Sequence, residues 1–193
     1  MSRRAVFIDR DGTLIEEAGY LSSLERLVFF PYTVDAVRQI HRAGFAVVVI
    51  TNQAGIARGI VTEDFVAAAH GHISARVEAG GGRIDAYYYC PHHPDGVVES
   101  LRIACQCRKP QPGLIRQAAE DLGIDLAASF TIGDRWHDVQ AGQAAGTRTI
   151  LVRTGYGRRE EEKAPEGISA AAIVDNLAAA AAVILSASRS GAA

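Results

Sequence analysis

Short runs of hydrophobic residues alternate with amphipathic stretches along most of the 193-residue chain. Runs of β-forming residues predict six strands, at residues 5–8, 46–50, 87–90, 130–132, 149–152 and 171–174. The run at 46–50, AVVVI, contains no polar position, which is typical of a strand buried on both faces of a sheet. The other runs are short and end abruptly at charged or turn-forming residues.

Helices are predicted between these strands. Val34, Val37 and Ile40 recur at helical spacing, and Gly44 stands where a helix C-cap belongs. Start and stop signals predict further helices at 62–79, 112–122 and 136–145, and an alanine-rich helix and tail at 176–193. The charged stretch 158–166 is predicted to be a solvated loop. This alternation predicts an α/β fold, a Rossmann-like parallel sheet with helices on both faces, in a single domain covering residues 1–193.

Composition is that of a globular chain. Hydrophobic residues make up 48% and charged residues 22%, and the net charge is −2 without a basic block, which argues against nucleic-acid binding as the main role. The longest apolar run, 177–185, is far shorter than the ~18 residues of a membrane span, and the run before Asp9 is too short for a signal peptide. We therefore expect a cytoplasmic monomer with neither a membrane nor a nucleic acid as partner.

Polar residues follow the predicted strands, where parallel sheets bind ligands. They are Asp9 and Asp11 after the first strand, Thr51–Gln53 after the second, Gly133, Asp134 and Asp138 after the fourth, and Arg108 and Lys109 before the helix at 112. Two carboxylates at i and i+2, with a third from a neighbouring strand, would form the oxygen-rich pocket that Mg²⁺ takes. A lysine and a hydroxyl suit a transferring phosphoryl group. Each motif alone could be an ordinary turn or cap, but all four in this order favour phosphoryl transfer.

The three cysteines of the chain lie in two short motifs joined by a loop. The C-x-H and C-x-C motifs at the ends of the loop 90–107 suit a tetrahedral structural Zn²⁺ whose ligands would be Cys90, His92, Cys105 and Cys107. His93 is a competing ligand, and three reduced cysteines in a small core are the alternative. Because the loop ends directly before Arg108 and Lys109, zinc would also fix that lysine.

Four motifs together resemble those of the haloacid-dehalogenase-like phosphohydrolases: DRDGT at 9–13, Thr51, Lys109, and GD…D at 133–138. The resemblance implies that Asp9 attacks phosphorus to form an aspartyl-phosphate, and that Asp11 protonates the leaving group and then activates water. It further implies a Mg²⁺ ion on Asp9, Asp134 and the main-chain carbonyl of Asp11. Thr51 and Lys109 would hold phosphoryl oxygens, and Asp138 would orient Lys109 or a metal-bound water.

A longer set of motifs narrows this resemblance to the heptose-bisphosphate phosphatases. It comprises Gly19-Tyr20, TNQAGIARG at 51–59, CPHHP at 90–94 and CQCRKPQPG at 105–113. The resemblance implies removal of the 7-phosphate of D-glycero-D-manno-heptose 1,7-bisphosphate, a step toward heptose for surface polysaccharide (lipopolysaccharide). The implied substrate contacts are Glu17, Gly19, Tyr20, Asn52, Gln53, Arg108 and Arg135. Tyr20 could equally be a packed loop aromatic.

Several alternatives remain open. A histidinol-phosphate phosphatase shares the zinc loop, other small sugar phosphates could be the substrate, and a non-catalytic zinc-stabilised binding module would keep the fold. Arg135 stands where the family often has lysine, and a planar guanidinium is not equivalent to an ammonium, which leaves the preferred sugar anomer open. No large cap domain is expected, because residues 12–32 and 55–62 leave too little chain.

Overall fold

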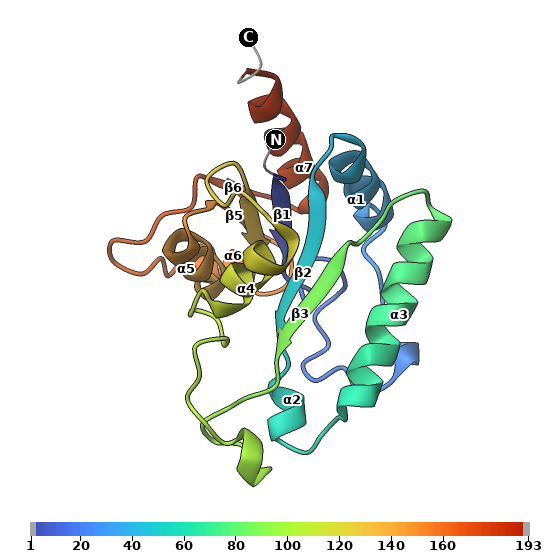
Figure 1. The fold of residues 1–193 in the computed structure, drawn as a ribbon, viewed down its shortest axis with the longest axis vertical. Coiled ribbons are helices and arrows are strands. Elements are labelled where there is room, and N and C mark those ends of the chain that lie inside the picture. Colours follow the sequence, from blue (N-terminus) through green and yellow to red (C-terminus); the bar gives the residue numbers. More distant parts are fainter. Residues whose placement is uncertain (1–2, 191–193) are drawn as a thin grey trace.

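Strand β1 (Ala5–Ile8) lies in the middle of a six-stranded sheet with the order β3-β2-β1-β4-β5-β6 (Figure 1). The other strands are β2 (Ala46–Asn52), β3 (Ala86–Cys90), β4 (Phe130–Gly133), β5 (Arg148–Val152) and β6 (Ala172–Val174). Val6 lies beside Val47 on one side and Phe130 on the other, and all the strand pairs are parallel. The structure, a computed structural model that describes residues 3–190, confirms the predicted parallel α/β sheet.

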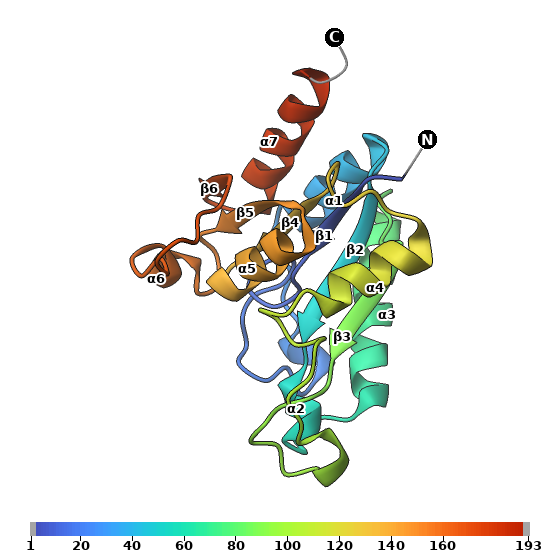
Figure 2. The same cartoon turned by 60° about the vertical axis from the view of Figure 1, so that its left-hand side comes forward.

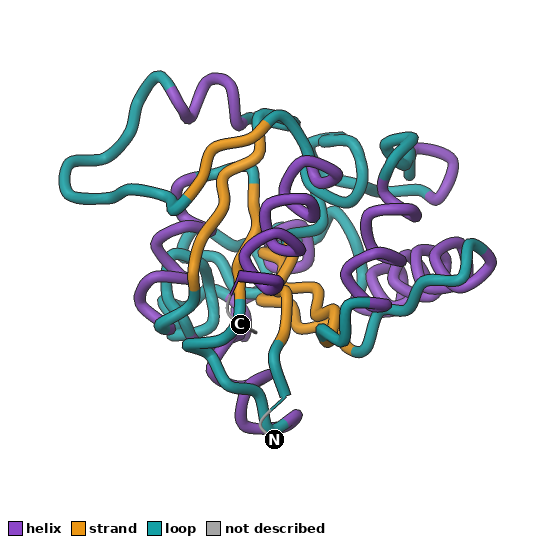
Figure 3. Tube along the Cα trace, turned by 90° about the horizontal axis from the view of Figure 1, so that it is seen from above, coloured by secondary structure: helices purple, strands orange, loops and turns teal. Residues whose placement is uncertain are grey.

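Helices cover both faces of this sheet (Figures 2 and 3). One face packs against α1 (Thr33–Arg42), α3 (Glu63–Ala79) and α7 (Leu177–Ser190), and the other against α4 (Gly113–Leu122) and α5 (Trp136–Ala145). Alternate residues of β1 point to opposite faces, so Val6 and Ile8 join the first core cluster and Ala5 and Phe7 the second. Burial of both faces explains why the strand sequences are continuously apolar.

The carboxyl ends of the strands point to one end of the molecule, the lower end in Figure 1. The chain leaves β1 for β2 and β3 on one side and then returns to β4 on the other side, which makes the end of β1 a topological switch point. The short helix α2 (Ala54–Ala57) and the loop after β3, with a single turn at Glu99–Leu101, lie below this end.

Residues 9–32 cross the same end as a loop with one turn at Leu24–Arg26. No cap domain is built from residues 3–190, as the sequence predicted. None of the described helices has the length and apolar character needed to cross a membrane. The cytoplasmic location and the monomeric state stay predictions.

The prediction for the charged stretch 158–166 was wrong in part, because residues Gly157–Glu161 form a short helix, α6. Its glutamates bind the body of the protein: Glu161 pairs with Arg153 at 2.7 Å, and Glu160 accepts a hydrogen bond from the main-chain N–H of Trp136 at 2.9 Å. The charged composition predicted solvent exposure, because the local sequence does not show that Arg153 and Trp136 lie beside these glutamates. In the predicted C-terminal segment, residues 191–193 lie outside the described residues.

Candidate active site

Three buried carboxylates meet at the carboxyl ends of β1 and β4. Asp9 follows β1, Asp134 follows β4, and Asp138 lies in the first turn of α5, where it accepts a hydrogen bond from the main-chain N–H of Arg135 at 3.0 Å. One oxygen of each carboxylate lies within 4.8 Å of the others. Burial raises the pKa of Asp134 to about 9, helped by the charges of Asp9 and Asp138. Crowded, buried carboxylates of this kind favour a bound cation.

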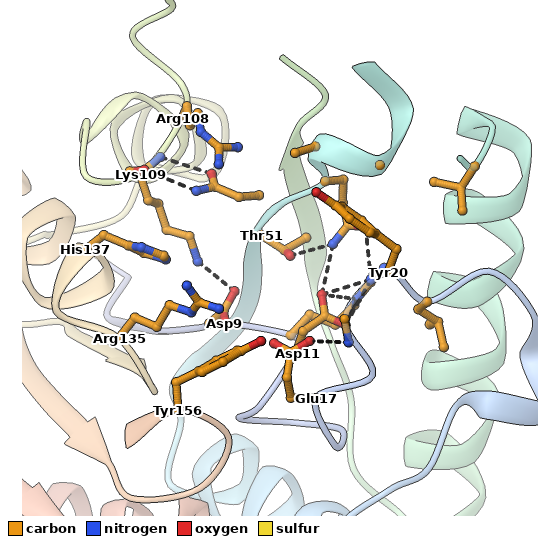
Figure 4. Close-up of a pocket in the computed structure, with 18 residues that line it drawn as sticks. Asp9, Asp11, Glu17, Tyr20, Thr51, Arg108, Lys109, Arg135, His137 and Tyr156 are labelled. Carbon is orange, nitrogen blue, oxygen red and sulfur yellow. Dashed lines mark hydrogen bonds and ion pairs between the residues drawn. The ribbon is translucent and has the colours of Figure 1, made fainter. Parts of the chain in front are cut away.

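Lys109 is the cation that the chain itself supplies to this group. Its Nζ lies 2.6 Å from an oxygen of Asp9 (Figure 4). It also lies 2.6 Å from an oxygen of Asp138, and it donates to the carbonyl of Ile50 at 3.0 Å. Burial opposes the lysine charge, but Asp138 and Asp9 raise the Lys109 pKa above its usual value. Burial raises the pKa of Asp9 to about 6, although Lys109 opposes that shift. The site therefore holds three carboxyl groups and one ammonium, with two of the carboxyl groups in contact with that ammonium. This excess of acidic groups suits a divalent cation.

Two glycines close around the Asp134 carboxylate. Gly12 has φ +80° and Gly155 has φ +53°, and a Cβ atom at either position would collide with Asp134. The main-chain N–H of Tyr156 donates to the same carboxylate at 2.8 Å. The carboxylate is thus held by the backbone of the loops that follow β1 and β5.

The side chain of Asp11 lies outside this carboxylate group. Its oxygens instead face Arg10, with an ion pair of 2.9 Å, and Gln53, whose amide donates at 3.0 Å. The expectation that the Asp9 and Asp11 carboxylates would share a cation is therefore not met by the side chains, although the main-chain carbonyl of Asp11 remains available. Gln53 also donates to Thr51 Oγ1 at 2.8 Å, so it positions both Asp11 and that hydroxyl.

Arg10 was missed by sequence reasoning. It is 1% exposed, and it donates to the side-chain oxygen of Gln53 at 3.0 Å as well as pairing with Asp11. A charged residue directly after a strand is ordinarily read as solvated, and nothing in its local sequence shows that Gln53 will lie beside it. Arg10 and Gln53 together fix the orientation of the Asp11 carboxylate.

Asn52 holds Lys109 in place. Its side-chain amide donates to the main-chain carbonyl of Lys109 at 3.1 Å and accepts from the main-chain N–H of the same residue at 3.0 Å. The resemblance implied a substrate contact for Asn52, but both ends of its amide are used within the protein. The structure therefore gives Asn52 a positioning contact on Lys109.

A pocket of about 300 Å³ opens over these groups (Figure 4). All the residues proposed from the sequence to touch substrate line it: Glu17, Gly19, Tyr20, Asn52, Gln53, Arg108 and Arg135. Tyr20 is 42% exposed, and its ring lies against Gly55 at the pocket rim. Glu17 accepts a hydrogen bond from the main-chain N–H of Gly19 at 2.6 Å, which fixes the shape of this loop.

His137 and Tyr156 also line the pocket, and neither was singled out from the sequence. Burial and the nearby Lys109 lower the pKa of His137 to about 3, so its imidazole is neutral. The sequence pattern predicts only that His137 lies in a helix, and it does not show that this is the turn facing the site. Tyr156 comes from the segment between β5 and α6, which carries no recognised motif.

The second candidate metal site is formed by Cys90, His92, Cys105 and Cys107, which form one cluster. The sulfur–sulfur distances are 3.1 to 3.5 Å, and His92 Nδ1 lies 3.3 Å from the Cys107 sulfur. A disulfide would require ~2.05 Å, so the thiols are free, whereas ligands of a tetrahedral zinc with bonds of ~2.3 Å stand roughly 3.8 Å apart. The donor set fits zinc, and the donor atoms lie somewhat closer together than that spacing.

His93 faces away from the sulfurs. Its ring nitrogens lie 3.3 and 3.4 Å from the Arg58 guanidinium, and its Nδ1 accepts a hydrogen bond from the main-chain N–H of Asp95 at 3.0 Å. The geometry therefore favours His92 over His93 as the fourth ligand. Cys107 is followed directly by Arg108, whose guanidinium donates to the carbonyl of His92 at 3.4 Å.

The HAD-hydrolase-like family model matches residues 106–180. A Yersinia pestis protein named D-glycero-beta-D-manno-heptose-1,7-bisphosphate 7-phosphatase is 43% identical over 152 residues, which are 78% of this chain and 81% of the relative. The protein of the same name from Escherichia coli K12 is 44% identical over 152 residues, 78% of this chain and 80% of the relative.

A solved structure resembles almost the whole fold. The crystal structure of D,D-heptose 1,7-bisphosphate phosphatase from B. bronchiseptica, complexed with magnesium and phosphate, has a TM-score of 0.85 and 32% sequence identity. The match covers 95% of this chain and 99% of that one. The likeness therefore extends over the sheet, the helices and the loops at the carboxyl ends of the strands.

Proposed function

The chain belongs to the haloacid-dehalogenase-like heptose-bisphosphate phosphatases, and on this premise we propose that it removes the 7-phosphate of D-glycero-β-D-manno-heptose 1,7-bisphosphate. The observation that carries the proposal is the buried group of Asp9, Asp134 and Asp138 around Lys109, at the floor of a pocket lined by Arg108 and Arg135. Carboxylates with one lysine suit phosphoryl transfer, and two further cations suit a substrate with a second phosphate.

The proposed cofactor is Mg²⁺, held by Asp9, Asp134 and the main-chain carbonyl of Asp11. All three offer oxygen, the donor type that Mg²⁺ prefers, and the carboxylate charges in the site exceed that of Lys109. When bound, the ion would neutralise the phosphoryl oxygens and orient the phosphate. Zn²⁺ is proposed as a structural ion on Cys90, His92, Cys105 and Cys107.

In the first half-reaction, a carboxylate oxygen of Asp9 attacks phosphorus, the bond between phosphorus and O7 of the sugar breaks, and an aspartyl-phosphate forms. The Asp11 carboxyl gives its proton to O7 as that bond breaks. Lys109 and Thr51 hold the phosphoryl oxygens, which have gathered negative charge. Arg10 and Gln53 keep the Asp11 carboxyl in reach, because both are bound to it and Arg10 is buried.

In the second half-reaction, water hydrolyses the aspartyl-phosphate. Asp11, now a carboxylate, takes a proton from the water while the water oxygen attacks phosphorus. The bond between phosphorus and the Asp9 oxygen breaks, which releases inorganic phosphate and restores the Asp9 carboxylate and the protonated Asp11. Splitting the displacement in two lets one acid–base residue serve both halves.

A phosphate-release screen tests this proposal. The purified chain is incubated with Mg²⁺ and, separately, with both anomers of the heptose bisphosphate, histidinol phosphate, other sugar phosphates and 4-nitrophenyl phosphate. We expect the β-bisphosphate to have the highest kcat/KM and to lose one phosphate per molecule, and we expect a chelator to abolish turnover. A higher kcat/KM with histidinol phosphate or another monophosphate would replace the proposed substrate. No release from any of them would support the non-catalytic binding module.

A further inference from the structure

Tyr156 stacks on Arg135 at the wall of the pocket. The central carbon of the Arg135 guanidinium lies 3.7 Å from the centroid of the Tyr156 ring, and both residues line the pocket. Figure 4 shows the guanidinium over the ring, beside Asp9. The ring therefore supports one face of the guanidinium and leaves its edge toward the substrate space.

The segment that carries Tyr156 is held by bonds that do not involve the tyrosine ring. The main-chain N–H of Tyr156 donates to Asp134, Thr154 Oγ1 donates to the carbonyl of Gly12 at 2.6 Å, and the Trp136 indole N–H donates to the carbonyl of Glu160 at 2.6 Å. Replacing the ring by another side chain leaves each of these bonds possible. The ring can thus be changed without removing the anchors of the loop.

The charge of Arg135 acts at the pocket, where it partly offsets the rise that burial causes in the pKa of Glu17 and of Asp134. Among residues 3–190, no carboxylate lies within ion-pair distance of Arg135, whereas the guanidinium of Arg10 is paired with Asp11 and that of Arg153 with Glu161. A planar guanidinium stacks face to face on an aromatic ring, which a tetrahedral ammonium does not do. The tyrosine at 156 therefore suits an arginine at 135 better than it would suit a lysine.

We propose that Tyr156 is a positioning residue for substrate selection. Its ring fixes the plane of the Arg135 guanidinium, so that the guanidinium binds the part of the bisphosphate remote from the transferred phosphoryl group. This inference rests on the proposed function, because it concerns the same pocket and a substrate with a second anionic group. Lys109 and Thr51 contact the transferred phosphoryl group, and Tyr156 acts on neither of them.

The test compares kcat/KM for the heptose bisphosphate with kcat/KM for 4-nitrophenyl phosphate, which has no remote anionic group. Tyr156→Leu removes the aromatic face, and we expect the ratio of the two constants to fall about tenfold, through a higher KM for the bisphosphate. Tyr156→Phe keeps the face, and its ratio should return to within about twofold of the unmodified protein. Arg135→Lys should lower the ratio by itself, and adding Tyr156→Leu to it should lower the ratio little further.

A matched control is Arg148→Lys, because the Arg148 guanidinium also stacks on an aromatic ring, that of Phe130, at 4.0 Å. Arg148 is the first residue of β5, at the end of that strand away from the pocket. It should not move the ratio. The inference is overturned if Tyr156→Leu slows both substrates equally, if Tyr156→Phe behaves like Tyr156→Leu, or if the effects at 135 and 156 multiply independently. If Tyr156→Leu does not fold, Tyr156→Met takes its place. An unmodified protein that hydrolyses only the aryl phosphate would refute the proposed substrate instead.

Discussion

The amide of Asn52 binds the main chain of Lys109 in both directions, at 3.1 and 3.0 Å. These two hydrogen bonds join the end of β2 to the segment before α4, which is far away in the sequence. The lysine side chain can then reach Asp9, 100 positions earlier in the chain, at 2.6 Å. The position of the Lys109 ammonium therefore depends on an amide that binds only the main chain of that lysine.

Asn52→Ala removes both of these bonds while leaving every charged group in place. We expect kcat/KM to fall about 10- to 100-fold, because a displacement of ~1 Å of a catalytic group can cost ~10²-fold. Steady-state kinetics with the preferred phosphate ester measures this. Asn176→Ala is the control, since Asn176 accepts a hydrogen bond from Ala179 at the start of α7, remote from the pocket, and should alter only stability. An unchanged kcat/KM in the Asn52 variant would contradict the positioning contact.

Variants of Asp9 and of Asp11 should differ in the burst of product that a rapid-mixing experiment measures. Asp9→Asn removes the nucleophile, so turnover should fall by orders of magnitude with no burst of product. Asp11→Asn keeps the nucleophile, and 4-nitrophenyl phosphate has a leaving group that departs without a proton. This variant should release up to about one 4-nitrophenol per chain quickly and then slow down, because no base activates water. A burst from the Asp9 variant would remove Asp9 from its assigned role.

Cys107→Ser tests the link between the cysteine cluster and the site. Metal analysis of the unmodified protein, purified without chelator, should find about one zinc per chain, and the variant should hold less. Because Cys107 precedes Arg108 and Lys109 directly, we expect loss of zinc to lower kcat/KM and also the preference for the bisphosphate over the aryl phosphate. Circular dichroism checks that the variant is folded. Unchanged rates with an unchanged preference would show that the cluster serves stability alone.

The burial of His70 leads us to expect that the folded protein loses stability in mild acid. It is 7% exposed on α3, stacks on Tyr87 at 4.3 Å, and has its pKa lowered to about 4 by burial and by the charge of Arg10. Since the unfolded chain takes up this proton near pH 6.5, the folded state loses stability as the pH falls from about 6.5 to about 4, by up to about 3 kcal/mol. Urea unfolding across this range measures the effect.

The variant His70→Gln should show a smaller loss of stability over the same pH range, because its side chain does not titrate. His72→Gln, at an exposed position two residues along the same helix, should show the same dependence of the free energy of unfolding on pH as the unmodified protein. If the free energy of unfolding fell equally with pH in the His70 variant and in the unmodified protein, other groups would cause the acid sensitivity.

The sequence predicted the sheet and its helices well, because continuous apolar runs and glycine stops are local signals. It also predicted that polar residues at several strand ends would meet, because parallel strands bring their carboxyl ends together. Asp9 and Asp134 are the example, since their separation along the chain does not matter once β1 and β4 are neighbours. The roles of these residues in catalysis stay predictions.

Contacts between side chains were not predictable in the same way. Gln53 and Asn52 read as substrate contacts, but their amides are bound to Asp11 and to Lys109. Arg10 was not singled out from the sequence and is buried, and Tyr156 carried no motif. In each case the deciding partner comes from a different strand end, and no local pattern encodes which rotamer brings the two together.

The crowding of Asp9, Asp134 and Asp138 has a consequence for how long the folded chain survives. The repulsion of Asp9 from the other two is present in the folded state and largely absent from the unfolded chain, where Asp9 lies far from Asp134 and Asp138, so it favours unfolding. A cation that binds the folded form alone shifts this balance back by mass action, by ~3 kcal/mol at a concentration 100 times its Kd. Magnesium supply would then govern resistance to proteolysis and heat as well as the rate of hydrolysis.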